Sequence, residues 1–203
     1  MITNREEVLE NALRVFAKMN YEKASQVEIA KACGLSKAGL IYYFPLKLDL
    51  FVAVIDKFVF RMQSPSVKFN FQACTLYEFI EQYISGVERT MSRLINMLDD
   101  GNNPSGCSFN FYYFHILMQV RLYYPNADKK IMQIFEQDYE IWRSAIKSAI
   151  ERKEIRGDID IESAALMFRQ IFLGLSFEQS FLGGLDTKFL ARKLRFAYSL
   201  LKA

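Results

Sequence analysis

The chain has 203 residues, of which 51% are hydrophobic and 24% are charged, so it is long enough and apolar enough to bury a full core. Its formal net charge of +3 is small, which excludes histone-like nonspecific coating of nucleic acid and permits only a local basic patch. Apolar residues recur at helical spacing along nearly all of the chain, without a clear alternating strand pattern or an Asn-Gly hairpin signal. We therefore expect an all-helical protein.

The first predicted helix begins after Thr3. Glu6 lies three residues further on, which completes a capping box at the helix start. The helix carries one apolar stripe, made of Val8, Leu9, Ala12, Leu13, Phe16 and Met19. We expect this stripe to pack under the two short helices that follow, with residues 20–24 as the link.

Two short helices around a glycine turn are predicted between Ser25 and Phe44. Ser25 and Glu28 form a second capping box, and Gly34 stands where the chain must leave the first helix with positive φ. Ser36 then caps the second helix, and Leu40 points back to the buried side. This pattern is typical of a helix-turn-helix and indicates duplex DNA as the partner.

Pro45 forces a break, after which a fourth helix is predicted to start near Lys47. Its expected inward face comprises Leu48, Phe51, Val54, Ile55, Phe58 and Met62. The segment Gln63-Ser-Pro-Ser66 should end this helix. We therefore divide the chain into a helix-turn-helix domain, residues 1–62, and a helical domain for effector binding and dimerisation, residues 63–203.

The second domain is rich in aromatic residues and is predicted to hold five helices. A capping box at Thr75 and Glu78 opens a helix that runs to about Leu98, and residues 99–106 have loop composition. Further helices are expected over residues 109–123, 126–153, 160–182 and 186 to the end, which gives about nine helices in total.

Several classes of protein do not fit the sequence. The first residues carry no apolar signal region, and no window approaches the roughly 18 uncharged apolar residues of a membrane span, so we expect a cytoplasmic protein without a membrane partner. Cys33, Cys74 and Cys107 are widely spaced and suggest free thiols rather than a disulfide framework or a metal site. With one histidine, the chain offers no convergent catalytic set, so we expect no enzyme and no cofactor.

The N-terminal unit resembles the DNA-binding domain of the TetR family of bacterial transcription regulators. The resemblance rests on Ile29-Ala-Lys-Ala-Cys-Gly-Leu-Ser-Lys-Ala-Gly-Leu-Ile-Tyr-Tyr-Phe-Pro-Leu-Lys-Leu-Asp-Leu-Phe51, which joins the helix-turn-helix spacing to the aromatic end of the recognition helix. It covers about the first 60 residues, and the remainder agrees only in length and helical character. Two positions depart from the family pattern: Leu46 replaces the usual Ser or Thr cap of the fourth helix, and Ile41 replaces a common aromatic residue.

The resemblance implies that the recognition helix lies in the major groove. The implied base-facing positions are Lys37, Ala38, Gly39 and Tyr42, and the positions on or near the DNA backbone are Ser25, Gln26, Ser36, Tyr43 and Lys47. Short side chains let a helix backbone approach base edges, whereas hydroxyls and helix-start amides donate well to phosphates. Lys37 could read guanine or hold a phosphate, and the two tyrosines could instead pack against the first helix.

For the larger domain, the resemblance implies a small-molecule pocket and a four-helix dimer interface made by the last two helices. Pocket candidates that combine apolar area with polar tips are Phe111, Tyr112, His115, Trp142 and Met167. Dimer candidates from the apolar stripes are Ala164, Phe168, Ile171, Leu175, Phe189, Leu190, Leu194 and Leu201. The alternative for each pocket candidate is ordinary core packing.

These features predict a sequence-specific DNA-binding transcriptional regulator, most simply a repressor. A homodimer would bind double-stranded DNA at a pseudo-palindromic operator and leave it when a small, largely apolar effector binds. The alternatives are an activator or an effector-independent regulator and, from another class, a helical small-molecule-binding protein or enzyme.

Overall fold

The computed structural model describes residues 5–62, 64–65, 69, 75–98 and 108–202, and this part of the chain is helical, as predicted. It contains nine α-helices and one π-helical segment. They are α1 (Arg5–Met19), α2 (Gln26–Ala32), α3 (Lys37–Tyr43), α4 (Lys47–Ile55) with its π-helical continuation η1 (Asp56–Arg61), α6 (Leu76–Leu98), α7 (Phe109–Tyr123), α8 (Ala127–Glu151), α9 (Ile161–Ser180) and α10 (Thr187–Leu201).

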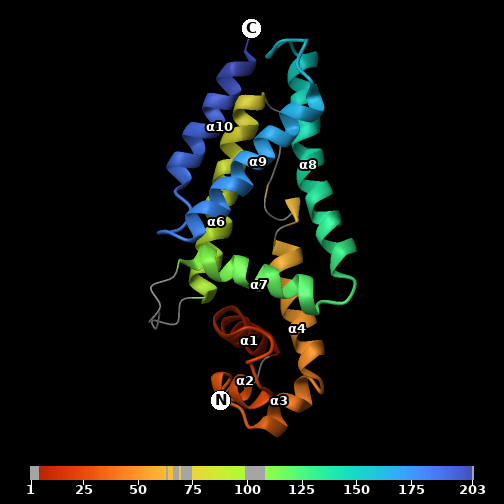
Figure 1. Cartoon of the computed structure of the whole chain (residues 1–203), viewed down its shortest axis with the longest axis vertical. Coiled ribbons are helices and arrows are strands. Elements are labelled where there is room, and N and C mark those ends of the chain that lie inside the picture. The colour runs from red at the N-terminus through yellow and green to blue at the C-terminus, as the bar shows by residue number, and fades with distance from the viewer. Residues whose placement is uncertain (1–4, 63, 66–68, 70–74, 99–107, 203) are drawn as a thin grey trace.

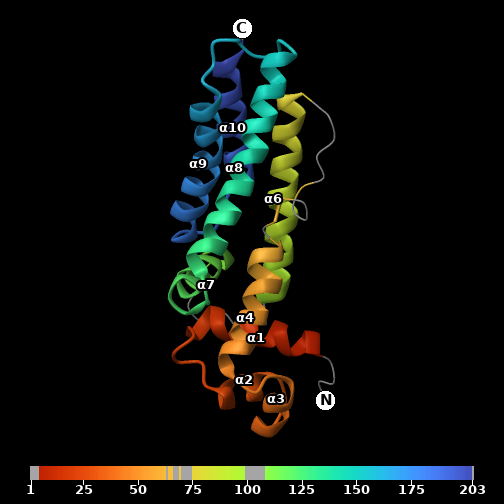
Figure 2. The same cartoon turned by 90° about the vertical axis from the view of Figure 1, so that its right-hand side faces the viewer.

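The helices form a small head and an elongated body (Figure 1). Helices α1, α2 and α3 make the head near the N-terminus, and α4 rises from the head into the body. In the body α6, α8, α9 and α10 run side by side along the long axis, as both views show (Figure 2). Helix α7 lies across the lower end of the body and contacts α1.

Two hydrophobic cores hold these parts together. The first core belongs to the head, but it also takes in Tyr112, Ile116 and Val120 of α7. The second core fills the body, with the fully buried Trp142 stacked 4.9 Å from Phe168. One face of α7 therefore packs in the core of the head, although the helix begins 47 residues after the predicted domain boundary at residue 62. The boundary itself stays a prediction.

Most of the predicted helix starts match the structure, but the inward face of α4 differs by one residue. Leu48 is 36% exposed, whereas Leu50 is buried and lies one turn before Val54. The helix begins at Lys47, so residues 50, 51, 54, 55 and 58 share the face toward α1. The Thr3 cap, Gln63, Ser66, the loop at 99–106, Cys74 and Cys107 lie outside the described residues.

Local polar contacts fix the ends of the body helices. The capping box of α6 is present, because the Thr75 amide donates to Glu78 at 2.9 Å and the Glu78 amide donates to the Thr75 hydroxyl at 3.2 Å. Glu154 also accepts from the Leu76 amide at 2.7 Å and from the Tyr198 hydroxyl at 2.9 Å. This carboxylate joins α6 and α10 to the turn after α8, a role that no sequence pattern indicated.

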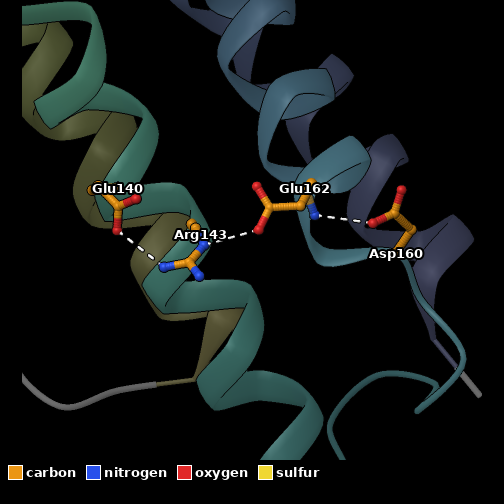
Figure 3. Close-up of polar contacts among 4 residues, drawn as sticks. All are labelled: Glu140, Arg143, Asp160 and Glu162. Atoms are coloured by element: carbon orange, nitrogen blue, oxygen red, sulfur yellow. Dashed lines mark hydrogen bonds and ion pairs between the residues drawn. The ribbon is translucent and has the colours of Figure 1, made fainter.

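An exposed polar link joins α8 to α9 (Figure 3). Arg143 donates to Glu162 at 3.0 Å and to Glu140 at 3.3 Å, while the Glu162 amide donates to Asp160 at 3.2 Å. These side chains are solvated, so the link orients the start of α9 and adds little stability.

Within the described residues, no single helix is long and apolar enough to cross a membrane, and only the bent pair of α3 with α4–η1 passes such a test together. The same residues hold no cluster of three or more His, Cys, Asp or Glu that could bind a metal ion. Cys33 is a buried free thiol, and burial raises its pKa to about 11.

Candidate DNA-binding interface and ligand cavity

The helix-turn-helix is built by local capping, as the sequence predicts. The Ser25 hydroxyl accepts from the Glu28 amide at 3.2 Å, and Glu28 accepts in return from the Ser25 amide at 2.8 Å. The bond from the Ser25 amide, together with the Ser25 hydroxyl beside the carboxylate, lowers the pKa of the Glu28 carboxyl. Gly34 ends α2 with a φ of +63°, and the Ser36 hydroxyl caps α3 by accepting from the Gly39 amide at 3.0 Å.

Helix α3 divides into a buried side and an open side. Leu40 is fully buried in the head core, whereas Lys37 and Ala38 are exposed and Tyr42 is 86% exposed. Tyr43 is half-buried and packs against the head core, and its contact with the DNA backbone stays a prediction. Tyr42 projects away from the core. The open side of α3 therefore presents a lysine, a phenol and a short side chain, a combination that suits a DNA groove.

Like Ser25 and Ser36, two further residues predicted to contact the DNA backbone have partners inside the chain. The Lys47 ammonium donates to the Tyr21 carbonyl at 2.8 Å and lies 4.3 Å from the centroid of the Tyr21 ring. The Gln26 amide donates to the Pro45 carbonyl at 3.3 Å. Both bonds tie helix starts of the head to neighbouring loops. Replacing Lys47 would therefore remove a structural contact as well as a positive charge.

Leu46 occupies the N-cap of α4 without forming a side-chain cap bond. It is 61% exposed and lies between the end of α3 and the start of α4. Asp49 stands in the first turn, where a carboxylate favours the helix dipole. The structure thus agrees with the expectation that this helix start lacks the usual cap.

A cavity of about 360 Å³ opens in the body between η1, α6, α7, α8 and α9. Its wall is predominantly apolar and includes six aromatic side chains: Phe60, Tyr113, Phe114, Phe135, Phe172 and Phe177. The volume lies in the range of small-molecule sites. Helix α7 supplies the longest continuous part of this wall, from Asn110 to Arg121.

The five residues predicted to bind an effector do not line this cavity. Tyr112 belongs to the head core, Phe111 packs against that core, and Trp142 is buried in the body core. The His115 Nδ1 lies 2.7 Å from the Ala17 carbonyl of α1, and Met167 lies on an open depression of α9. Three of the predicted residues lie on the head-facing side of α7, and the effector-binding role of all five stays a prediction. Tyr113 and Phe114 of the same helix line the cavity and were not among the predicted residues.

The predicted dimer residues are also largely occupied within the chain. Five of them are buried in the body core: Ala164, Phe168, Leu190, Leu194 and Leu201. Ile171, Leu175 and Phe189 are half-buried. The apolar side chains that remain exposed on α9, at its end and on α10 are Leu166, Phe177, Phe181, Leu182, Phe196 and Leu200. The predicted dimer contacts came from the most continuous apolar stripes of α9 and α10, and the residues of these stripes pack mostly in the chain's own core.

Comparisons with known proteins agree with this geometry. Residues 8–54, which span α1 to α4, match the family described as bacterial regulatory proteins, tetR family. The biofilm operon icaADBC HTH-type negative transcriptional regulator IcaR of Staphylococcus aureus is 23% identical over 185 residues, which cover 87% of each protein.

Solved structures extend the likeness to the whole fold. The ketosteroid transcriptional regulator KstR2 of Mycobacterium tuberculosis has a TM-score of 0.64 with 15% identity, covering 100% of this chain and 97% of that one. AibR, solved with isovaleryl coenzyme A and operator DNA, has a TM-score of 0.63 with 19% identity, covering 97% of both chains. The chain belongs to the TetR family of bacterial transcriptional regulators.

Proposed function

We propose that the protein is a transcriptional repressor that binds a pseudo-palindromic operator as a homodimer in the cytoplasm and leaves it when a small, largely apolar effector enters the cavity. The observation that carries the DNA-binding part is the open side of α3, where Lys37 and the 86% exposed Tyr42 project from a capped, rigid helix. The similarity to IcaR, a negative regulator, favours repression. AibR, crystallised with a ligand and operator DNA, gives a precedent for joint binding.

Homodimer formation is supported by the exposed apolar side chains of α9 and α10. Leu166 on α9 and Phe196 and Leu200 on α10 are 39%, 61% and 54% exposed. Exposed apolar area of this extent on neighbouring helices favours a partner with the same surface. A two-fold dimer would place two copies of α3 in successive major grooves.

For an effector to release the protein from DNA, binding in the cavity must alter the head. Helix α7 contacts both. On its cavity side lie Tyr113 and Phe114; on its other side Gln119 donates to the Phe16 carbonyl at 3.0 Å, and His115 contacts the Ala17 carbonyl. Those carbonyls belong to the last turn of α1, and the Phe16 carbonyl also accepts from the Asn20 amide at 3.2 Å. A ligand that shifts α7 therefore shifts α1, and effector and operator weaken each other reciprocally.

The DNA-binding part is tested by gel shift with the DNA flanking the protein's own gene and with unrelated DNA of equal length. The expected result is retardation of the flanking DNA at salt concentrations that abolish binding to the unrelated DNA. Lys37→Ala and Tyr42→Ala should each weaken that binding by about tenfold or more, whereas Lys188→Ala on α10 should leave it unchanged. Equal binding to both DNAs, or a loss with Lys188→Ala as large as with Lys37→Ala, would contradict the proposal.

Repression is separated from activation by a reporter fused to the same flanking DNA. A repressor lowers transcription when it is expressed, and Tyr42→Ala restores transcription. Transcription that rises with the protein and falls with Tyr42→Ala would identify an activator.

A further inference from the structure

The cavity wall contains one polar group that the described residues leave without a hydrogen bond. Tyr113 lies on the cavity side of α7, where its ring approaches the neighbouring Phe114 ring edge-to-face at 5.8 Å between centroids. Burial alone raises its pKa well above the ordinary value, so the phenol stays neutral at any physiological pH. A hydroxyl in such surroundings gains from any partner that enters the cavity.

The other neutral polar side chains of the wall each take part in a hydrogen bond within the protein. The Thr90 hydroxyl donates to the Gly86 carbonyl at 2.9 Å, and the Asn110 amide donates to the Ser176 hydroxyl at 3.3 Å. Tyr113 is therefore the polar side chain best placed to orient a ligand, and as a phenol it donates to an oxygen acceptor.

The charged groups of the wall have counter-charges within the protein. Asp138 lies 3.8 Å from Arg169, with both side chains 17% exposed, and Arg121 lies 3.2 Å from Asp128. An ionised ligand would leave water for an apolar wall without an uncompensated opposite charge to receive it. Such a transfer is costly, which favours an uncharged ligand.

From these observations we infer that the cavity takes a neutral, predominantly apolar molecule carrying a hydroxyl or carbonyl oxygen, and that Tyr113 donates a hydrogen bond to this oxygen. The six aromatic side chains of the wall favour a ligand with a flat apolar body. The volume of about 360 Å³ lies near the lower end of the range of small-molecule sites, which suits a small aromatic compound. The inference rests on the proposed function, because it names the chemistry of the proposed effector.

The test uses four probes with one skeleton: naphthalene, 2-naphthol, 2-naphthoate and 2-naphthylmethylammonium. Binding of each to the full-length protein is measured by calorimetry at neutral pH. We expect 2-naphthol to bind at least tenfold more tightly than either ion. Tyr113→Phe should lower the affinity for 2-naphthol about 2- to 12-fold and leave the affinity for naphthalene unchanged, because only the hydrogen bond is removed.

Tyr112→Phe is the matched control, because Tyr112 lies on the head-facing side of the same helix. It should leave the affinity for all four probes unchanged. Three results would each overturn the inference. They are tighter binding of either ion than of 2-naphthol, no binding of any probe at 1 mM, and equal losses of affinity for naphthalene and 2-naphthol with Tyr113→Phe.

A parallel gel shift with the flanking DNA keeps the two proposals apart. If 2-naphthol binds as expected but leaves the retarded complex intact, the ligand class stands and effector-driven release fails. If the flanking DNA is retarded but the probes give any of the overturning results, DNA binding stands and the ligand class is wrong.

Discussion

The uncapped start of α4 allows a direct test of how local signals stabilise the DNA-binding head. Leu46 has φ −112° and ψ 142°, an extended conformation close to that of the capping residues Ser25 and Ser36. A serine can adopt this conformation and accept from an amide of the first turn. The substitution Leu46→Ser should therefore supply the missing cap.

The magnitude follows from a comparison with Leu46→Ala. Leu46 is 61% exposed, so both variants lose the same modest leucine packing, and their difference isolates the cap. A serine N-cap stabilises a helix by about 1 kcal/mol relative to alanine. For a chain of this size, that corresponds to a difference in Tm of about 2–4 °C.

The assay is thermal and urea unfolding followed by circular dichroism, with Leu46→Ser and Leu46→Ala measured side by side. Ser36→Ala is the reverse control, because it removes a cap bond that α3 possesses and should cost a similar amount. Equal stability of the serine and alanine variants at position 46, combined with a clear loss in Ser36→Ala, would refute the reasoning about α4.

Three further outcomes are expected. Gly34→Ala forces a side chain into positive φ and should lower the free energy of unfolding by about 1 kcal/mol in urea titrations, although no atom lies within 4 Å of the added Cβ. Glu154→Ala leaves two amides of α6 and the Tyr198 hydroxyl without their acceptor and should lower the Tm, whereas Glu151→Ala should not. The capping bonds lower the pKa values of the Glu28 and Glu78 carboxyls. Their contribution to the free energy of unfolding is therefore present above the ordinary value of 4.5 and is lost as pH falls through the folded-state pKa. The double variant Glu28→Gln, Glu78→Gln should lose less stability than the parent protein between pH 7 and 3, measured by urea titration.

The fold could be predicted because its helix boundaries are set by short-range signals. Ser25, Gly34 and Ser36 each act on residues at most three or four positions away, and Pro45 acts on its immediate neighbours. These contacts form between residues that are close in sequence, so they do not depend on the rest of the chain. The positions that face solvent on α3 follow from the same helical spacing, with Leu40 as the buried reference.

The cavity could not be placed in the same way because α7 is apolar on both sides. Tyr112 and Tyr113 are adjacent aromatics, yet the first belongs to the head core and the second to the cavity wall. Helical spacing separates the two faces, but both carry large apolar residues, so it gives no reason to assign either face to the ligand. On α9 and α10, likewise, the most continuous apolar stripe packs in the chain's own core, whereas a second, less continuous set of apolar side chains is exposed.

Because one face of α7 packs in the head core and the other lines the cavity, the proposed coupling between cavity and head would act through packing. Tyr112 and Ile116 of α7 share one core with Phe16 of α1 and Phe51 of α4, and close-packed cores transmit displacement rather than absorb it. The cavity also borders Phe60 in η1, and π-helical turns are rare segments that occur most often at functional sites. Under the proposed function, a ligand in the cavity would contact Phe60, which packs against this shared core, and Tyr113, the chain neighbour of its member Tyr112. Because α3 lies next to α4 along the chain, a ligand-induced shift at the cavity would change the setting of α3 against DNA, as the proposed release requires.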